Sequence, residues 1–133
     1  MTVVADFKVS KWSAYKGEFY GHHRIIVIYE TSEDAHFFVV TSQVDKARIR
    51  ARYDEESLVF IDQSEWGQLT CPSCVECSKR NLKRISKSNM QKLYEAWAVK
   101  SIGEVPETVR KRIIDAINAS VSYSEREKQI YTL

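Results

Sequence analysis

The 133-residue sequence has no long hydrophobic run, little net charge and few cysteines. No apolar stretch approaches the roughly 20 residues that a membrane-spanning helix requires. The first residues also lack the basic region and apolar core of a signal peptide. The formal net charge is only +2, so overall charge does not indicate a nucleic-acid partner. Three cysteines would leave one unpaired in a disulfide framework, so we expect a protein of the reducing cytoplasm.

The composition is that of one folded domain. Hydrophobic residues make up 44% of the chain and charged residues 29%, which is typical of an ordinary globular protein. A chain of this length supports one substantial domain and not two. We therefore expect a single domain over residues 1–120 and a polar tail over 121–133 that frays.

Short apolar segments predict strands in the first two thirds of the chain. Residues 24–29 form a continuous β-branched stretch, typical of a strand buried on both faces. The turn residues 31–34 and the apolar segment 36–40 predict the returning strand of a hairpin. A loop is expected over residues 16–23. Further short strands are expected within residues 1–15 and over 58–61, 74–77 and 82–85.

The last third changes to a helical period. Ser86 or Ser88 is a suitable cap for a short helix, which Gly103 is expected to end. The buried side of this helix is expected to carry Met90, Leu93, Tyr94 and Trp97. Pro106 suits the first turn of a second helix. In that helix, apolar residues recur at helical spacing at Val109, Ile113, Ala116 and Ile117. The sum is an α+β fold, with a small curved sheet or open barrel and two helices.

Groups able to handle protons and phosphate gather at the ends of the hairpin strands. Cleavage of RNA without a metal requires a base, a proton donor and positive charge at the phosphorane. The residues before and at the start of the first strand supply these groups: Glu18, His22, His23 and Arg24. Thr41 and Ser42, at the end of the second strand, are suited to donate to phosphate oxygens. The alternative is a solvated loop in which Arg24 makes a surface ion pair.

Basic residues alternate strictly with others over residues 46–53. In a strand, one face would carry Lys46, Arg48, Arg50 and Arg52. Residues two apart on a strand lie about 6.6–7 Å apart, close to the spacing of successive phosphates in an extended single strand. The segment therefore predicts a track for an RNA backbone. The alternative is that these side chains protect an exposed sheet edge from aggregation.

Three cysteines lie close together in the sequence, at Cys71, Cys74 and Cys77. Their spacing is compatible with three thiolate ligands of a zinc ion, which would make the protein a small zinc-stabilised adaptor. A fourth ligand is not evident nearby in the sequence. The alternative is that cysteine acts here as a small buried hydrophobic residue.

The order of these segments resembles the MazF/PemK-like toxin family. Residues 21–28 followed by 39–42 are similar to the family's strand pair, which opens with Arg-Pro and closes with a Thr-Ser-type pair. Residues 73–77, 82–86 and 102–117 are similar to its later strands and its turn into the final helix. Ile25 stands where the family has proline. The typical N-terminal strand of the family is not recognisable in residues 1–15.

The resemblance implies an SH3-like β-barrel of about five to seven strands with two C-terminal helices, assembled as a homodimer. It implies a metal-independent endoribonuclease without a cofactor, the toxin of a type II toxin–antitoxin system. Such a toxin cuts single-stranded RNA at short sequences, leaves a cyclic phosphate and is restrained by a cognate antitoxin protein.

By position, the resemblance implies that Arg24 stabilises or protonates the scissile phosphate and that Thr41 holds a phosphate oxygen. Glu18 and His23 are further catalytic candidates. The candidates for RNA binding are Ser42, Gln43, Lys46, Arg48, Arg50 and Arg52. The alternative is an inactive module of the same fold that binds RNA or a protein such as a topoisomerase.

Overall fold

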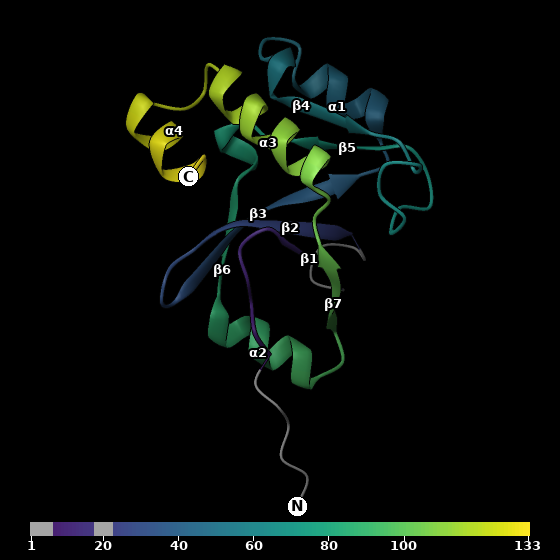
Figure 1. Cartoon of the computed structure of the whole chain (residues 1–133), viewed down its shortest axis with the longest axis vertical. Helices are drawn as coiled ribbons and strands as arrows, with labels where there is room; N and C mark the ends of the chain where they lie inside the picture. Colours follow the sequence, from purple (N-terminus) through teal and green to yellow (C-terminus); the bar gives the residue numbers. More distant parts are fainter. Residues whose placement is uncertain (1–6, 18–22) are drawn as a thin grey trace, which may run out of the picture.

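The fold is a mixed α+β arrangement built around one antiparallel sheet (Figure 1). The computed structural model describes residues 7–17 and 23–133. The strands are β1 (Ser13–Gly17), β2 (Arg24–Glu30), β3 (Asp34–Thr41), β4 (Leu58–Ile61), β5 (Ser73–Glu76), β6 (Lys83–Ser86) and β7 (Val99–Glu104). The helices are α1 (Val44–Arg50), α2 (Lys87–Glu95), α3 (Glu107–Ala119) and α4 (Glu125–Tyr131), with short 3₁₀ turns η2 (Glu55–Ser57) and η3 (Lys79–Asn81). The predicted α+β class is confirmed.

The sheet is open and follows the strand order β4-β5-β3-β2-β1-β7. Strand β3 shares one of its edges between two partners. Its first half pairs with β6, and its last two residues pair with β5. Over the part of the chain that the structure describes, β4 and β7 end the order, so each is an edge strand. The end of β3 therefore lies between the start of β2 and the start of β5.

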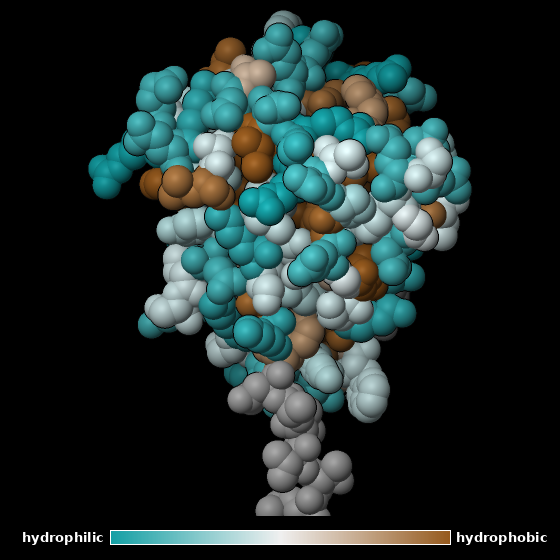
Figure 2. Space-filling model, in the orientation of Figure 1, coloured by the Kyte–Doolittle hydropathy of each residue, from teal (hydrophilic) through white to brown (hydrophobic). Residues whose placement is uncertain are grey.

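Hydrophobic cores lie on both faces of the sheet, which explains why β2 is apolar along most of its length. Ile25 and Val27 belong to the core that includes Met90 of α2. Ile26 and Ile28 belong to the core that α3 covers. Figure 1 shows α2 and α3 on opposite sides of the central strands. Figure 2 shows hydrophobic side chains between largely hydrophilic ones on the face in view. The prediction of a strand buried on both faces is confirmed.

The two predicted helices are present in the last third. Ser86 is the N-cap of α2, because its Oγ accepts a hydrogen bond of 3.1 Å from Asn89 N. Helix α3 begins directly after Pro106. It buries the four residues expected to face the sheet: Val109, Ile113, Ala116 and Ile117. No helix of the described residues is both long enough and apolar enough to cross a membrane.

The basic strand predicted over residues 46–52 is wrong, because this segment forms helix α1. Ala47 and Ala51 are buried, whereas Ile49 is 64% exposed and Tyr53 is 85% exposed. Burial every four residues is the helical pattern, and a half-buried strand would have covered all four side chains. Alanine, lysine and arginine also have high helix propensity, which favours the observed state.

Two expectations around the end of α2 are also wrong. The helix ends at Glu95 and not at Gly103, which instead lies within β7 and pairs with Ala14 of β1. Trp97 lies beyond the helix and is 93% exposed, although helical spacing had predicted it in the core. Residues 99–104 mix polar side chains and a glycine with only two apolar residues, Val99 and Ile102. Their strand state therefore depends on pairing with β1, which no local pattern shows.

The tail predicted to be polar and fraying contains helix α4. The helix begins with a capping box, in which Ser124 and Glu127 bond to each other's backbone N–H groups. Tyr123 OH donates a hydrogen bond of 2.7 Å to the carbonyl of Cys77. Tyr131 OH lies 3.2 Å from Nδ1 of His36 in β3. These contacts hold the tail against the domain. At the other end of the chain, the strand expected within residues 1–15 on Phe7, Val9 and Trp12 is not there, because β1 begins only at Ser13 and runs to Gly17. Residues 1–6 lie outside the described part.

Candidate functional site

A small pocket lies where β2 begins and β3 ends. Its volume is about 170 Å³. Arg24 opens β2 and stands opposite Val40 of β3, so the two side chains point to the same face of the sheet. The pocket is lined by His23, Arg24, Val40, Ser42, Leu69, Thr70, Cys71 and Ser73. The structure thus brings together three of the predicted site residues, His23 and Arg24 at the start of β2 and Ser42 just after β3.

Arg24 is the chemically distinctive residue of this pocket. Its side chain is partly buried, and the Nε atom has no hydrogen-bond partner within residues 7–17 and 23–133. A buried donor without an acceptor costs about 1–3 kcal/mol, and more when the group is charged. A bound oxyanion would satisfy a guanidinium in this position, because the planar fork matches phosphate oxygens.

The other groups of the pocket suit the same chemistry. His23 precedes Arg24 and is exposed, so its imidazole is accessible to a ligand. An imidazole exchanges protons near neutral pH. The hydroxyls of Ser42 and Thr70 are possible donors to phosphate oxygens, whereas the Ser73 hydroxyl donates to the carbonyl of Cys71 at 3.0 Å. Together these side chains provide positive charge, a proton carrier and neutral donors.

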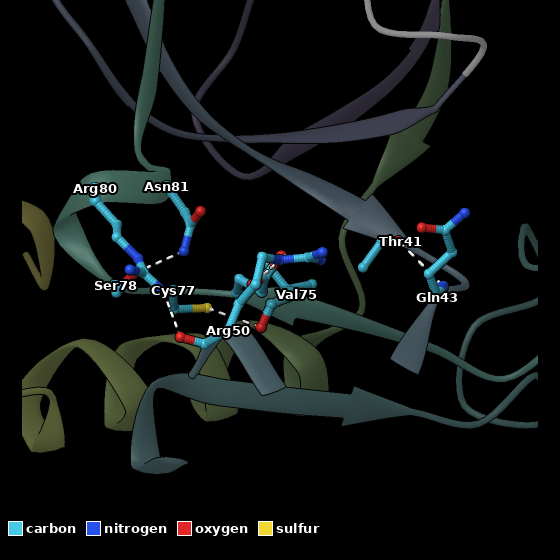
Figure 3. Close-up of polar contacts among 9 residues, drawn as sticks. Thr41, Gln43, Arg50, Val75, Cys77, Ser78, Arg80 and Asn81 are labelled. Atoms are coloured by element: carbon cyan, nitrogen blue, oxygen red, sulfur yellow. Dashed lines mark hydrogen bonds and ion pairs between the residues drawn. The ribbon is translucent and has the colours of Figure 1, made fainter. Parts of the chain in front are cut away.

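Thr41 does not line this pocket. It follows Val40 in β3 and therefore points to the opposite face of the strand. Its Oγ1 accepts a hydrogen bond of 3.1 Å from the backbone N–H of Gln43, as Figure 3 shows. Ser42 takes the place in the pocket that the sequence had suggested for Thr41. The predicted role of Thr41 at a phosphate oxygen stays a prediction.

Glu18 and His22 lie outside the described residues, as do positions 18–22 of the loop predicted over residues 16–23. The catalytic role proposed for Glu18 therefore stays a prediction. The loop prediction is wrong at Lys16 and Gly17, which belong to β1. His23 and Arg24 remain the part of the predicted loop-and-strand unit that the structure describes.

The arginines of α1 make contacts within the protein. Arg50 donates to both carboxylate oxygens of Glu76 in β5, at 3.0 and 2.9 Å. This hydrogen-bonded pairing with Glu76 raises the pKa of Arg50 above its usual value. Figure 3 shows Arg50 beside β5, where Arg80 donates to its carbonyl oxygen. Arg50 thus serves to fasten α1 to the sheet.

The neighbouring arginines Arg48 and Arg52 also make contacts within the protein, in their case with aromatic rings. Arg48 lies over the ring of Phe60, 4.9 Å from its centroid. Arg52 lies over Tyr53 at 4.9 Å and donates to the carbonyl of Ile49. The flat phosphate track that the strand pattern suggested is therefore not the geometry of this segment. RNA binding by Gln43, Lys46 and these arginines stays a prediction without that geometric support.

The three cysteines do not form a metal centre. Among the described residues, no group of three or more His, Cys, Asp or Glu side chains is placed to hold a metal ion. Cys74 and Cys77 are buried, and burial raises the pKa of Cys74 to about 11. Burial also raises the pKa of Cys77. The zinc alternative is therefore not supported, and both thiols pack as small hydrophobic side chains.

Thr70 and Ser73 are pocket residues that the sequence analysis missed. Thr70 comes from the connection between β4 and β5, and Ser73 opens β5, both more than 25 residues after Ser42. The signal that finds them is the strand order, since Thr41 pairs with Cys74 at the start of β5. Polar residues just before β5 must then lie beside those just after β3.

Comparisons of the sequence with protein families and with curated proteins found no match. The sequence matches no protein-family model. No curated protein compared with the chain is similar enough to count as a relative. Any statement about function must therefore come from the residues of the pocket and from the pattern of the sequence.

Proposed function

We propose that the protein is a metal-independent endoribonuclease of the MazF/PemK-like kind, with Arg24 at the scissile phosphate. The observation that carries the proposal is the buried Nε of Arg24, which lacks a partner among the described residues. It lies in a pocket that also holds His23 and Ser42. A pocket of about 170 Å³ is large enough for a phosphate but small for a whole nucleotide. The bases would then lie outside it.

The proposed reaction uses the RNA's own 2′-hydroxyl as nucleophile. A base takes the 2′-hydroxyl proton, and the 2′-oxygen attacks the neighbouring phosphorus. The bond to the 5′-oxygen breaks, that oxygen receives a proton, and a 2′,3′-cyclic phosphate remains. The Arg24 guanidinium stabilises the negative charge of the phosphorane. His23 is suited to one of the two proton transfers, and the hydroxyl of Ser42 to a phosphate oxygen.

The wider proposal follows the family pattern. In it, the open sheet corresponds to an SH3-like barrel, the chain forms a homodimer, and a cognate antitoxin protein restrains the activity in the cytoplasm. The order of the elements supports it, because α3 follows the last strand directly after Pro106. Ile25 is fully buried in the core on the α2 side, so the strand start is intact without the family's proline.

The test is cleavage of long single-stranded RNA in EDTA by the wild type and by Arg24→Ala. Removing a group that stabilises transition-state charge should lower the rate about 10²–10³-fold. The matched control is Arg126→Ala, because Arg126 is an exposed arginine of α4 that does not line the pocket. Its rate should equal that of the wild type. RNA with 2′-O-methyl groups should remain intact.

Two results would overturn the proposal. One is the absence of defined cleavage across several long RNAs at high protein concentration. The other is equal cleavage by the wild type and Arg24→Ala, with both variants shown to be folded by circular dichroism. RNA binding without cleavage would instead identify an inactive binding module of the same fold.

A further inference from the structure

Trp97 occupies a backbone position that normally belongs to glycine. It has φ of 61°, in the left-handed region, directly after α2. The backbone N–H of Trp97 bonds to the carbonyl of Tyr94, and that of Ala98 bonds to the carbonyl of Leu93. These two bonds define a Schellman motif, in which the residue at this position is usually glycine. A bulky residue is unfavourable here, so its presence requires a reason other than the turn.

Packing within the protein does not provide that reason. The Trp97 side chain is 93% exposed. It lies at the rim of a pocket of about 320 Å³, between the end of α2 and the start of β7. The apolar walls of this pocket include Phe7, Tyr94 and Val99. The rings of Phe7 and Tyr94 are in contact, with centroids 4.6 Å apart. An exposed indole beside an aromatic pocket is a suitable platform for a flat apolar ligand.

The chain segment that contains Trp97 is basic in sequence, although Lys83 and Arg84 lie in β6, which pairs with β3, and Lys87 forms an ion pair with Glu30. Residues 83–100, which run from β6 through α2 to the start of β7, hold five basic side chains and a single acidic one. The basic residues are Lys83, Arg84, Lys87, Lys92 and Lys100. The acidic residue, Glu95, also lines the pocket, and it accepts a hydrogen bond from the side-chain amide of Gln91. Because the whole chain has a net charge of only +2, this segment concentrates the positive charge.

A row of cations runs across the sheet from Lys100, which lines the Trp97 pocket, to Arg24. In the sheet, Lys16 of β1 stands opposite Arg24 of β2 on one side and opposite Lys100 of β7 on the other. Residues directly opposite point to the same face, and neighbouring strands lie about 4.8 Å apart. Neither lysine has an ion-pair partner among the residues that the structure describes. The row therefore spans about 10 Å at one end of the sheet.

We propose that Trp97 stacks an unpaired base of single-stranded RNA, whose backbone follows Lys100 and Lys16 to Arg24. The identity of the RNA rests on the function proposed above, but the binding does not require cleavage. Stacking on aromatic side chains beside a basic groove is how proteins hold single strands without reading their sequence. The three cations Lys100, Lys16 and Arg24, which stand opposite one another in the sheet, favour a polyanion over a neutral partner.

The test is the affinity for a labelled, uncleavable 2′-O-methyl RNA oligonucleotide. Loss of one base–aromatic stack should weaken binding by about fivefold or more in Trp97→Ala, whereas Trp97→Phe should keep most of the affinity. Tyr53→Ala is the matched control, because Tyr53 is an 85% exposed aromatic residue that follows α1 and does not line the Trp97 pocket. Its affinity should be unchanged. Lys100→Ala should lower the slope of log affinity against log salt by about one.

Tryptophan fluorescence gives a second measurement on the same complex. Trp12 and Trp66 are buried, whereas Trp97 is exposed. Most of the fluorescence quenching that RNA causes should therefore come from a base stacked on Trp97. Unchanged affinity and quenching in Trp97→Ala would overturn the inference. So would a variant that loses binding to anionic lipid vesicles, or changes its sedimentation, while its RNA affinity stays the same. These results would assign Trp97 to a membrane or to a second copy of the chain.

The outcomes also separate the two proposals. Cleavage by the wild type with unchanged binding in Trp97→Ala would leave the proposed function standing and remove the stacking site. Weaker binding in Trp97→Ala with no cleavage by the wild type would leave the stacking site standing and remove the nuclease.

Discussion

Replacing Trp97 with glycine should stabilise the protein, although it removes the largest side chain at this surface. The left-handed backbone at Trp97 costs an L-residue about 1–2 kcal/mol, and glycine avoids this cost. Glycine in turn makes the unfolded chain more flexible, which costs about 0.4–1 kcal/mol. The indole is 93% exposed, so little hydrophobic burial is lost. For a side chain of about 250 Å² at 25 cal/mol per Å², the lost burial amounts to about 0.4 kcal/mol.

The net gain for Trp97→Gly is about 0.5 kcal/mol over the wild type. The sharper comparison is with Trp97→Ala, which also removes the indole but keeps an L-residue at φ of 61°. The glycine variant should exceed the alanine variant by about 0.8–1 kcal/mol in the free energy of unfolding. For a chain of this size, that difference corresponds to about 3–4 °C in Tm.

Urea denaturation followed by circular dichroism measures the free energies, and a thermal scan measures the Tm values. The reasoning is refuted if Trp97→Gly is less stable than Trp97→Ala. It is also refuted if both variants lose more than about 1 kcal/mol, because that result would show a packed indole.

Three further predictions concern other parts of the fold. Tyr123→Phe should lower the free energy of unfolding by about 1–2 kcal/mol in urea titrations, because it removes a buried hydrogen bond to the carbonyl of Cys77. Hydrogen bonding from Lys79 lowers the pKa of Glu127 from 4.5 to about 2, so this pair stabilises the fold above pH 4.5 and loses its effect as the pH falls towards 2. The free energy of unfolding should fall less over this pH range in Lys79→Ala than in the wild type. Equal pH dependence in the two proteins would contradict the prediction. Iodoacetamide should modify only the partly exposed Cys71 in the native protein but all three cysteines in urea, as mass spectrometry would show.

The sequence was sufficient for elements whose own side chains decide their state. The β2 segment is apolar on both faces, and α3 repeats its apolar residues at helical spacing after Pro106. The sequence was misleading where a strand-like alternation and a helical spacing occur in the same segment. In residues 46–53, alternation and a four-residue spacing of alanines occur together, and only the burial of Ala47 and Ala51 distinguishes them. A further signal was missed, because Ser124 and Glu127 have the spacing of a capping box.

The candidate site was predictable in part for a related reason. Arg24 and Ser42 lie at the two ends of a local hairpin, which the sequence shows directly. Thr70 and Ser73 join them only because β5 pairs with β3, and Lys100 joins the row only because β7 pairs with β1. Such pairing between distant segments depends on the packing of the whole sheet, and single-sequence patterns do not contain it.

The late position of β7 has a consequence for how the protein matures. It is the last strand of the sheet to be synthesised, and it pairs Val99 with Gly17 and Glu104 with Ser13, near the other end of the chain. Every residue that lines the Arg24 pocket precedes β5 or opens it. These residues are synthesised before Trp97 and Lys100, but two of them, Val40 and Leu69, pack in the core that α3 completes, and α3 follows β7. Both halves of the proposed RNA site therefore depend on late segments of the chain, the pocket on α3 and the stacking surface on β7.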